Sequence, residues 1–379
     1  MPRKIIIALN SLERIGKEAK FLGGSSKILV VTDKSVRSTG APDKAITTLK
    51  AEGFEPSLLD ITEQEPRIEV LEEMSSFARN GGFEIVVGIG GGSVMDTAKL
   101  LSVGITNPGN RRDYIGLNLV KKRGVPTICV PTTAGTGSEV TQFAVFTFNN
   151  KKKPCSSPNI IPDVALIDPM ITISMPPSIT AGTGMDALAH AVESVISTEA
   201  TPLTDAFAFL AIGLVFKYLR RAYFRPNDVE ARYNMSLAAT VAGIPLCNAK
   251  MVIGHSISQT FGPLYKVPHG ISNAMTLPYI MKFYIPAASE KLVRIAIESG
   301  EDVKCRSTMD AALMAAKAVK KLADDIDIQA SLGNVGIAQE SLPKMAEEIL
   351  VNFPRPNSPI DMNKDKVLKI LQWMYKGEM

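Results

Sequence analysis

Histidine and cysteine are both scarce in this sequence of 379 residues, which contains three of the first and four of the second. The cysteines are Cys129, Cys155, Cys247 and Cys305. They are far apart and form no CxxC pair, which excludes a disulfide framework and a thiolate metal site. We therefore expect reduced thiols in a cytoplasmic protein.

Long apolar runs and a strong charge of one sign are also lacking. The N-terminus has no apolar stretch followed by a small-residue cleavage site, so no export signal is predicted. The most apolar helical stretch, residues 206–216, is eleven residues long. A membrane span needs ~20 residues, so we expect a buried core helix. The net charge is +4 and the basic clusters are short, which favours solvated faces over a nucleic-acid surface.

The length of the chain suggests two domains. Up to about residue 175, short β-branched runs such as residues 27–33 (KILVVTD) alternate with helical stretches. That alternation predicts an α/β domain with a Rossmann-like, doubly wound parallel sheet. From Pro177 onward the pattern is helical, and Pro176-Pro177 cannot lie inside a helix. We therefore predict an α/β domain of residues 1–176 and an all-helical domain of residues 177–379.

A glycine-rich stretch, VVGIGGGSVMDTAK (residues 86–99), follows a predicted strand. Glycine lets the backbone approach a ligand closely, and a helix that starts near Val94 with Ser93 as its cap offers free N–H groups to a phosphate. A plain strand–helix turn is the alternative. The stretch lacks the Gly-Lys-Ser/Thr of a Walker loop and the last glycine of the usual dinucleotide fingerprint.

Two further stretches can complete a nucleotide site. Asp33 ends the strand of residues 27–33, where its carboxylate can accept both ribose hydroxyls and would repel a 2′-phosphate, which favours NAD over NADP. The neighbouring Lys34 weakens this preference for NAD. Asp33 can equally be a strand-end cap. The loop PTTAGTGSEVT (residues 131–141) can hydrogen-bond a phosphate or a nicotinamide amide, or can be an ordinary surface loop.

The three histidines can form a metal site in the second half. Asp186 and His190 stand four residues apart, on one face of a predicted helix. His255 and His269 would lie ~21 Å apart on one straight helix, but a break at Gly262-Pro263 would let both reach one ion. The alternative is three unrelated histidines. An Asp/His₃ set suits Fe²⁺ or Zn²⁺ and leaves room for a substrate.

A nucleotide site in one domain and an open metal site in the other indicate chemistry in the cleft between them. A Lewis acid that lowers the pKa of an alcohol, beside a nicotinamide that accepts a hydride, performs dehydrogenase chemistry.

The sequence resembles the iron-activated (group III) alcohol dehydrogenase family almost from end to end. The stretches that carry the resemblance are VTD, GGGSVMDTAK, PTTAGTGSEVT, PDVALIDP, PPSITAGTGMDALAHAVES, PHGISNAMTLP and PRPNSPIDMNKDKVLKIL. The resemblance implies a Rossmann-like N-terminal domain, a helical C-terminal domain and the metal ligands Asp186, His190, His255 and His269. It also implies a cofactor-binding set of Asp33, Gly90, Gly91, Gly92, Ser93, Asp96, Thr132, Thr133, Thr136, Thr141 and Lys152.

The sequence departs from the family pattern near the reacting centre. Gln259 stands where many relatives carry a histidine near the nicotinamide, and glutamine cannot relay a proton as imidazole does. Val252 stands where relatives often have glycine, and "IALNS" replaces the usual N-terminal Phe-Gly-x-Gly. The candidates to line the substrate pocket are Phe143, Phe146, Cys247 and Gln259, and a core role is the alternative for the first three.

We therefore expect an enzyme that transfers a hydride between a nicotinamide cofactor and a small primary alcohol, diol or aldehyde. NAD is the expected cofactor with NADP as the alternative, and Fe²⁺ the expected ion with Zn²⁺ as the alternative. The rival enzymes are of the dehydroquinate synthase or glycerol dehydrogenase type, and the non-enzyme rival is a nucleotide-binding scaffold with a structural metal. We expect a homodimer or larger homo-oligomer with no nucleic-acid or membrane partner.

Overall fold

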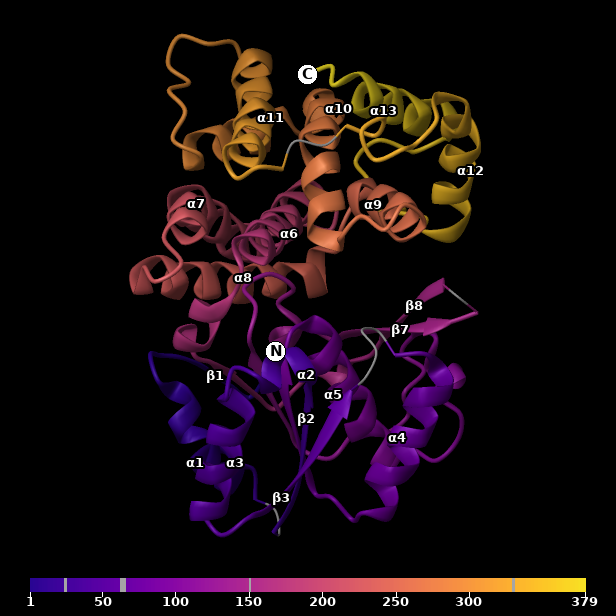
Figure 1. The fold of residues 1–379 in the computed structure, drawn as a ribbon. Coiled ribbons are helices and arrows are strands. Elements are labelled where there is room, and N and C mark those ends of the chain that lie inside the picture. The colour runs from indigo at the N-terminus through magenta and orange to yellow at the C-terminus, as the bar shows by residue number, and fades with distance from the viewer. Residues whose placement is uncertain (24–25, 62–65, 150, 329–330) are drawn as a thin grey trace. The chain divides into compact units, whose positions relative to one another are not determined.

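Two compact units make up the chain in the computed structural model, Met1–Ser174 and Met175–Met379. The structure describes residues 1–23, 26–61, 66–149, 151–328 and 331–379 (Figure 1). The first unit is α/β and the second is helical, so the predicted fold classes are confirmed.

Within the described residues, six parallel strands form the main sheet of the first unit, in the order β1-β9-β6-β4-β2-β3. The strands are β1 (Lys4–Ile7), β2 (Lys27–Asp33), β3 (Glu55–Ile61), β4 (Ile85–Gly90), β6 (Thr127–Pro131) and β9 (Val164–Ile167). The helices of this unit are α1 (Ile15–Leu22), α2 (Lys34–Arg37), α3 (Ala41–Ala51), α4 (Ile68–Asn80) and α5 (Gly92–Thr106).

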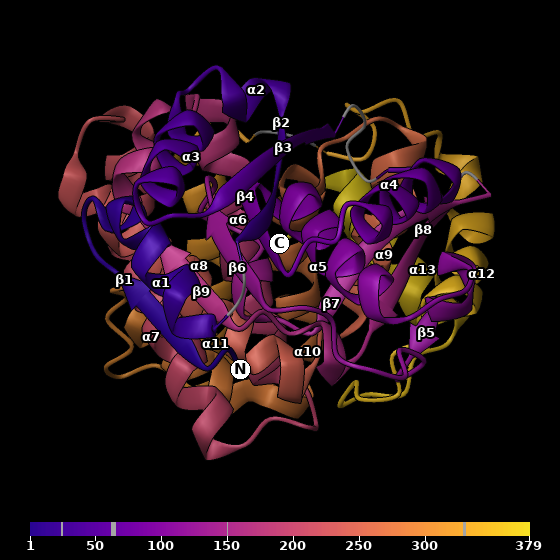
Figure 2. The same cartoon turned by 90° about the horizontal axis from the view of Figure 1, so that it is seen from below.

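Both faces of this sheet are covered, which explains its continuous apolar strands. Successive side chains of a strand point to opposite faces. In β2, Ile28 and Val30 accordingly pack into the core cluster that contains residues of α1 and α3. Leu29 and Val31 pack into a second cluster, with residues of α4 and α5. Figure 2 shows these helix pairs on opposite sides of the sheet.

The strand order reverses between β2 and β4. After β2 the chain passes through α3 to β3 on one side, and after β4 it passes through α5 to β6 on the other. Ligands of open α/β sheets bind at such a switch point, beyond the carboxyl ends of the strands. Asp33 ends β2 and Gly90 ends β4, so two of the predicted cofactor residues flank this point.

A small second sheet in the first unit was not predicted. It contains β5 (Gly116–Leu117), β7 (Phe143–Phe148) and β8 (Lys151–Ser156), with β7 and β8 antiparallel. The lysines of β8 form one of the short basic clusters of the sequence, and the family resemblance implies that Lys152 binds the cofactor. In the sheet, Lys152 pairs with Thr147 of β7.

The second unit is built around α6 (Pro177–Ile196), which is buried at every residue from 184 to 196. Helices α7, α8 and α10 pack against it. The remaining helices are α7 (Pro202–Phe224), α8 (Val229–Ala249), α9 (Ile253–Leu264), α10 (His269–Glu298), α11 (Thr308–Asp325), α12 (Leu342–Asn352) and α13 (Lys364–Lys376).

Helix α7 is longer than the sequence analysis predicted. It contains 23 residues, begins after the capping residue Thr201, and is long and apolar enough to cross a membrane by length and composition. Half of its most apolar window is buried inside the protein. The prediction that this segment is too short for a span is therefore wrong, because the helix continues on both sides of residues 206–216.

Candidate functional site

Helix α6 presents Asp186 and His190 from its buried middle. The two residues are one helical turn apart and are 3% and 5% exposed. Buried polar side chains such as these need hydrogen-bond or ionic partners. The partners come from α9, which carries His255 near its start, and from α10, which begins at His269.

The chain reverses between His255 and His269, but not where the sequence analysis placed the break. Helix α9 continues through Gly262 and Pro263 to Leu264. The proline is tolerated because the helix ends one residue later, so little regular structure is lost. The reversal follows over residues 265–268, where the Val267 N–H donates to the Gly262 carbonyl at 2.8 Å.

The reversal brings the predicted ligands together around one carboxylate oxygen. Oδ1 of Asp186 lies 3.8 Å from Nε2 of His190, 3.8 Å from Nε2 of His255 and 3.5 Å from Nε2 of His269. Donor atoms of Asp186, His255 and His269 all lie within 4.8 Å of one another, and His190 is outside this mutual group. Ligands ~2.1 Å from a tetrahedral ion lie ~3.4 Å apart, so the spacing fits a metal ion.

Asn273 also reaches this cluster, although it was not predicted from the sequence. Its Nδ2 lies 2.7 Å from Asp186 Oδ1, 3.1 Å from His255 Nε2 and 3.2 Å from His269 Nε2. Its Oδ1 is buried without a hydrogen-bond partner among the described residues. Its amide nitrogen therefore faces three of the side chains that would hold the ion, and Asn273 keeps them close together. Its position one turn after His269 was the available signal.

The charges of the cluster favour a cation. Burial alone would raise the pKa of Asp186, but the three histidines hold that pKa well below its usual range. Burial alone would lower the pKa of His255, yet the carboxylates of Glu193 and Asp186 raise it to about 9. The two carboxylates therefore favour a positive charge at His255, and a metal ion held by this residue would take the place of the proton.

The glycine stretch forms a tight junction between β4 and α5. Helix α5 begins at Gly92, and its N-cap residue Gly91 makes no side-chain capping bond. Ser93 therefore lies inside the first turn, and the prediction that it caps the helix is wrong. A Cβ at Gly92 would lie 2.9 Å from Cγ2 of Thr136, and one at Gly91 would lie 3.6 Å from Oγ1 of Thr133. Backbone N–H groups at such a helix start bind phosphate well.

A buried lysine ties the threonine-rich loop to α5. The side chain of Lys99 is 0% exposed, and its ammonium lies 2.6 Å from Ser138 Oγ and 2.7 Å from the Phe143 carbonyl. Asp96 accepts hydrogen bonds from Ser138 Oγ at 2.6 Å and from the Val145 N–H at 3.0 Å. Asp96 thus positions the loop, a role that the sequence did not predict.

The predicted threonines divide into two groups. Thr133 and Thr136 face the glycines at the start of α5. Thr132 and Thr141 are buried. The Thr132 N–H donates to the Gly90 carbonyl at 3.0 Å, and Thr141 Oγ1 lies 3.4 Å from the Lys99 ammonium.

Asp33 is a helix cap in the structure. Its Oδ1 accepts the Val36 N–H at 2.8 Å and the Ser35 hydroxyl at 2.5 Å. The capping alternative is therefore correct. This capping role is compatible with ribose binding, because both hydrogen bonds use Oδ1 and leave the other carboxylate oxygen for a ribose.

The pocket candidates do not share one environment. Phe146 is 0% exposed and belongs to a hydrophobic core cluster, so its assignment to the pocket is wrong and its core alternative holds. Phe143 on β7 is partly buried in the first unit, whereas Cys247 and Gln259 are partly buried on α8 and α9 of the second.

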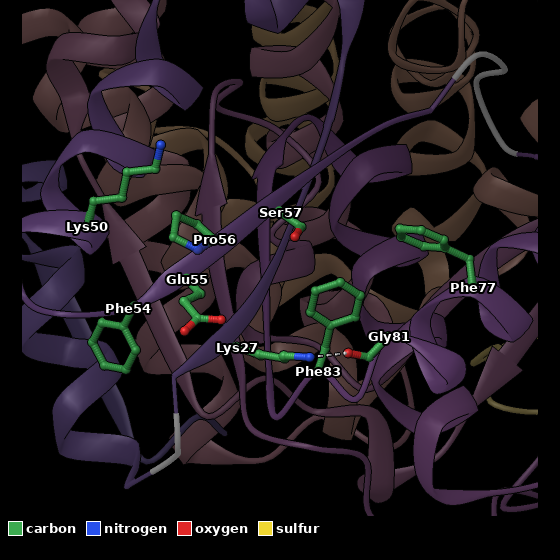
Figure 3. A pocket seen from close by; sticks show the side chains of 9 residues that line it. All are labelled: Lys27, Lys50, Phe54, Glu55, Pro56, Ser57, Phe77, Gly81 and Phe83. Carbon is green, nitrogen blue, oxygen red and sulfur yellow. Dashed lines mark hydrogen bonds between the residues drawn. The ribbon is translucent and has the colours of Figure 1, made fainter.

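A surface hollow in the first unit lies at the other end of the sheet (Figure 3). Lys27 and Glu55, at the amino ends of β2 and β3, line it, and the Lys27 ammonium lies 3.5 Å from the Gly81 carbonyl. The predicted cofactor residues follow the carboxyl ends of the strands. The hollow is therefore not part of the candidate nucleotide site.

Two family models together match most of the chain. The family model "Iron-containing alcohol dehydrogenase" matches residues 2–169, and the model "Fe-containing alcohol dehydrogenase family, C-terminal" matches residues 180–375.

Individual relatives match over nearly their whole length. The chain is 36% identical to the 1,3-propanediol dehydrogenase of Citrobacter freundii over 96% of this chain and 95% of that protein. It is 33% identical to the NAD-dependent methanol dehydrogenase of Bacillus methanolicus over 95% and 94%. A crystal structure of a 1,3-propanediol oxidoreductase superposes with a TM-score of 0.95 at 35% identity, covering 98% of each chain. The chain belongs to the iron-containing alcohol dehydrogenase family.

Proposed function

We propose that this protein oxidises a small primary alcohol or diol with NAD, or reduces the corresponding aldehyde, with Fe²⁺ held by Asp186, His190, His255 and His269. The observation that carries the proposal is the convergence of three imidazole Nε2 atoms on one oxygen of Asp186, at 3.5 to 3.8 Å. Zn²⁺ is the alternative ion, because the same nitrogen and oxygen donors suit it.

The residues of the chain divide the work of the reaction. When bound, the ion supplies a Lewis acid that lowers the pKa of the alcohol. The N–H groups at the start of α5 bind the pyrophosphate of the cofactor, and Asp33 binds its ribose. Gln259 lies one turn after His255 and cannot relay a proton as imidazole does, so the alcohol proton leaves through water, ribose hydroxyls or another group.

The residues of the metal cluster bear on each of the rival functions. A dehydroquinate-synthase-like reaction uses a phosphorylated acid and needs additional basic residues, but all three histidines of the sequence already lie at the metal cluster. A glycerol-dehydrogenase-like activity differs only in the polyol, and it is an outcome of the substrate test below. A structural metal site is disfavoured, because such sites are usually closed and rich in thiolates.

A substrate panel tests the proposal. Protein prepared without oxygen, with Fe²⁺ or Zn²⁺ added, is assayed with alcohols and diols of two to four carbons and with the matching aldehydes. We expect NADH absorbance to rise with alcohols, to fall with aldehydes, and to depend on the added ion. No change with any substrate, combined with metal content that is unaltered in His255→Ala, would disprove the proposal.

We also propose that Asp33 makes the enzyme prefer NAD. Asp33→Ser keeps an oxygen that can cap α2 and removes the charge that repels a 2′-phosphate. We expect kcat/KM for NADP relative to NAD to rise at least about tenfold, since charge repulsion at close range is worth more than ~1.4 kcal/mol. Steady-state kinetics with both cofactors measure the ratio. Asp43→Ser, an exposed acid on α3, is the control. An unchanged ratio in Asp33→Ser would leave Asp33 as a helix cap only.

We further propose a cytoplasmic homo-oligomer. All four cysteines lie in the described part of the chain, and none of them forms a disulfide. Burial raises the pKa of Cys129 and of Cys155 to about 12, so neither thiol is reactive at neutral pH.

A further inference from the structure

His255 is held on the side of its ring that faces away from the other ligands. Glu193, on α6, is 1% exposed. Its Oε1 lies 2.5 Å from Nδ1 of His255, and its Oε2 accepts the backbone N–H of His255 at 3.3 Å. One carboxylate therefore binds both the ring and the backbone of this residue, which restricts the rotation of the imidazole.

The contact determines which ring nitrogen is available to a metal. A carboxylate only accepts hydrogen bonds, so Nδ1 of His255 carries the proton that it donates to Glu193. In the neutral imidazole, Nε2 then keeps its lone pair. Nε2 is the atom that lies 3.8 Å from Asp186 Oδ1 and 3.1 Å from Asn273 Nδ2, within the cluster.

The backbone of α9 leaves space for this carboxylate. A Cβ at Gly254 would lie 2.7 Å from Oε1 of Glu193 and 2.5 Å from Cδ1 of Ile280. Any residue larger than glycine would push the carboxylate away from His255. Gly254 and Glu193 therefore act together on the position of the imidazole.

We propose that Glu193 is a positioning residue that holds His255 in the tautomer and orientation in which Nε2 binds the active-site ion. The inference rests on the proposed metal site and assigns Glu193 no ligand role of its own. Carboxylates that hydrogen-bond the second nitrogen of a metal-binding histidine raise its basicity, and their removal weakens metal binding by about 10- to 100-fold.

The experiment measures metal binding apart from turnover. Glu193→Gln and Glu193→Ala are compared with wild type by competition for Co²⁺ with a coloured chelator, and by the visible absorption bands of the Co²⁺-loaded protein. We expect the Co²⁺ dissociation constant to rise about 10-fold in Glu193→Gln and about 100-fold in Glu193→Ala, with shifted absorption bands in both. In Gly254→Ala the added methyl group would crowd the same carboxylate. We expect the Co²⁺ dissociation constant to rise in this variant as well.

Ser194→Ala is the matched control. Ser194 follows Glu193 on α6, is 0% exposed, and has no hydrogen-bond partner for its hydroxyl among the described residues. We expect its Co²⁺ affinity and spectrum to equal those of wild type, with unchanged NADH binding in every variant.

Two results would overturn the inference. One is wild-type Co²⁺ affinity and absorption in folded Glu193→Gln. The other is a loss of thermal stability in the metal-free variants with an unchanged Co²⁺ spectrum, which would make Glu193 a structural residue only. A failure of the proposed function is a separate outcome, and His255→Ala reveals it. If the proposed metal site is wrong, His255→Ala binds Co²⁺ as tightly as wild type does.

Discussion

His255→Ala is expected to weaken metal binding and to lower turnover strongly. The substitution removes a nitrogen donor that lies 3.8 Å from Asp186 Oδ1 and leaves Glu193 buried without its main partner. A Lewis acid supplies several kcal/mol of stabilisation in the transition state. We therefore expect kcat/KM to fall at least roughly 10³-fold, since each ~1.36 kcal/mol is a factor of ten. Metal analysis and steady-state kinetics on the same preparation measure the two losses.

A threonine on the same helix provides the control for this variant. Thr260 donates its hydroxyl to the Ser256 carbonyl within α9 at 2.9 Å. We expect Thr260→Ala to keep wild-type metal content and activity. If His255→Ala retains both as well, the cluster around Asp186 is not the metal site of the enzyme.

The candidate metal ligands could be predicted from the sequence because their spacing and their rarity act together. Asp186 and His190 share a helical face by the 3.6-residue period alone. The approach of His255 to His269 required a chain reversal, and a proline near the middle of the stretch predicted one. The location of the reversal was wrong, because a proline in the last turn ends a helix without breaking its earlier turns.

Glu193 and Asn273 were missed although their positions follow the same periodicity. Glu193 is seven residues after Asp186, and Asn273 is four residues after His269. Neither residue type indicates a metal site by itself. The contacts that give them a role come from residues 62 and 18 positions away from them in the sequence.

The candidate nucleotide site followed the same pattern. The glycines and Asp33 were predictable because they end strands, and strand ends of a parallel sheet share one edge. The hydrogen bonds of Asp96 and Lys99 to the threonine-rich loop join residues about forty positions apart. Local sequence patterns carry no information about such contacts.

Gly270→Ala is expected to be the most disruptive single-methyl change near the metal cluster. A Cβ at Gly270 would lie 2.5 Å from the carbonyl carbon of Gly182 and closer still to its oxygen. These are backbone atoms of α6, so relief requires the two helices to separate. Asp186 on α6 and His269 on α10 would separate with them. We expect a loss of about 3 kcal/mol in the free energy of unfolding and a fall of about 10²-fold in kcat/KM, measured by denaturant unfolding and by kinetics.

Gly182→Ala, on the other side of this contact, tests whether backbone crowding causes the losses expected for Gly270→Ala. A Cβ at Gly182 would point to Ile271, whose Cδ1 would be 3.5 Å away, an ordinary van der Waals distance. Alanine is also preferred to glycine inside a helix by up to about 1 kcal/mol. Gly182→Ala should therefore fold at least as stably as wild type and bind metal normally. If Gly270→Ala behaves in the same way, the close approach of α6 and α10 does not set the distance between Asp186 and His269.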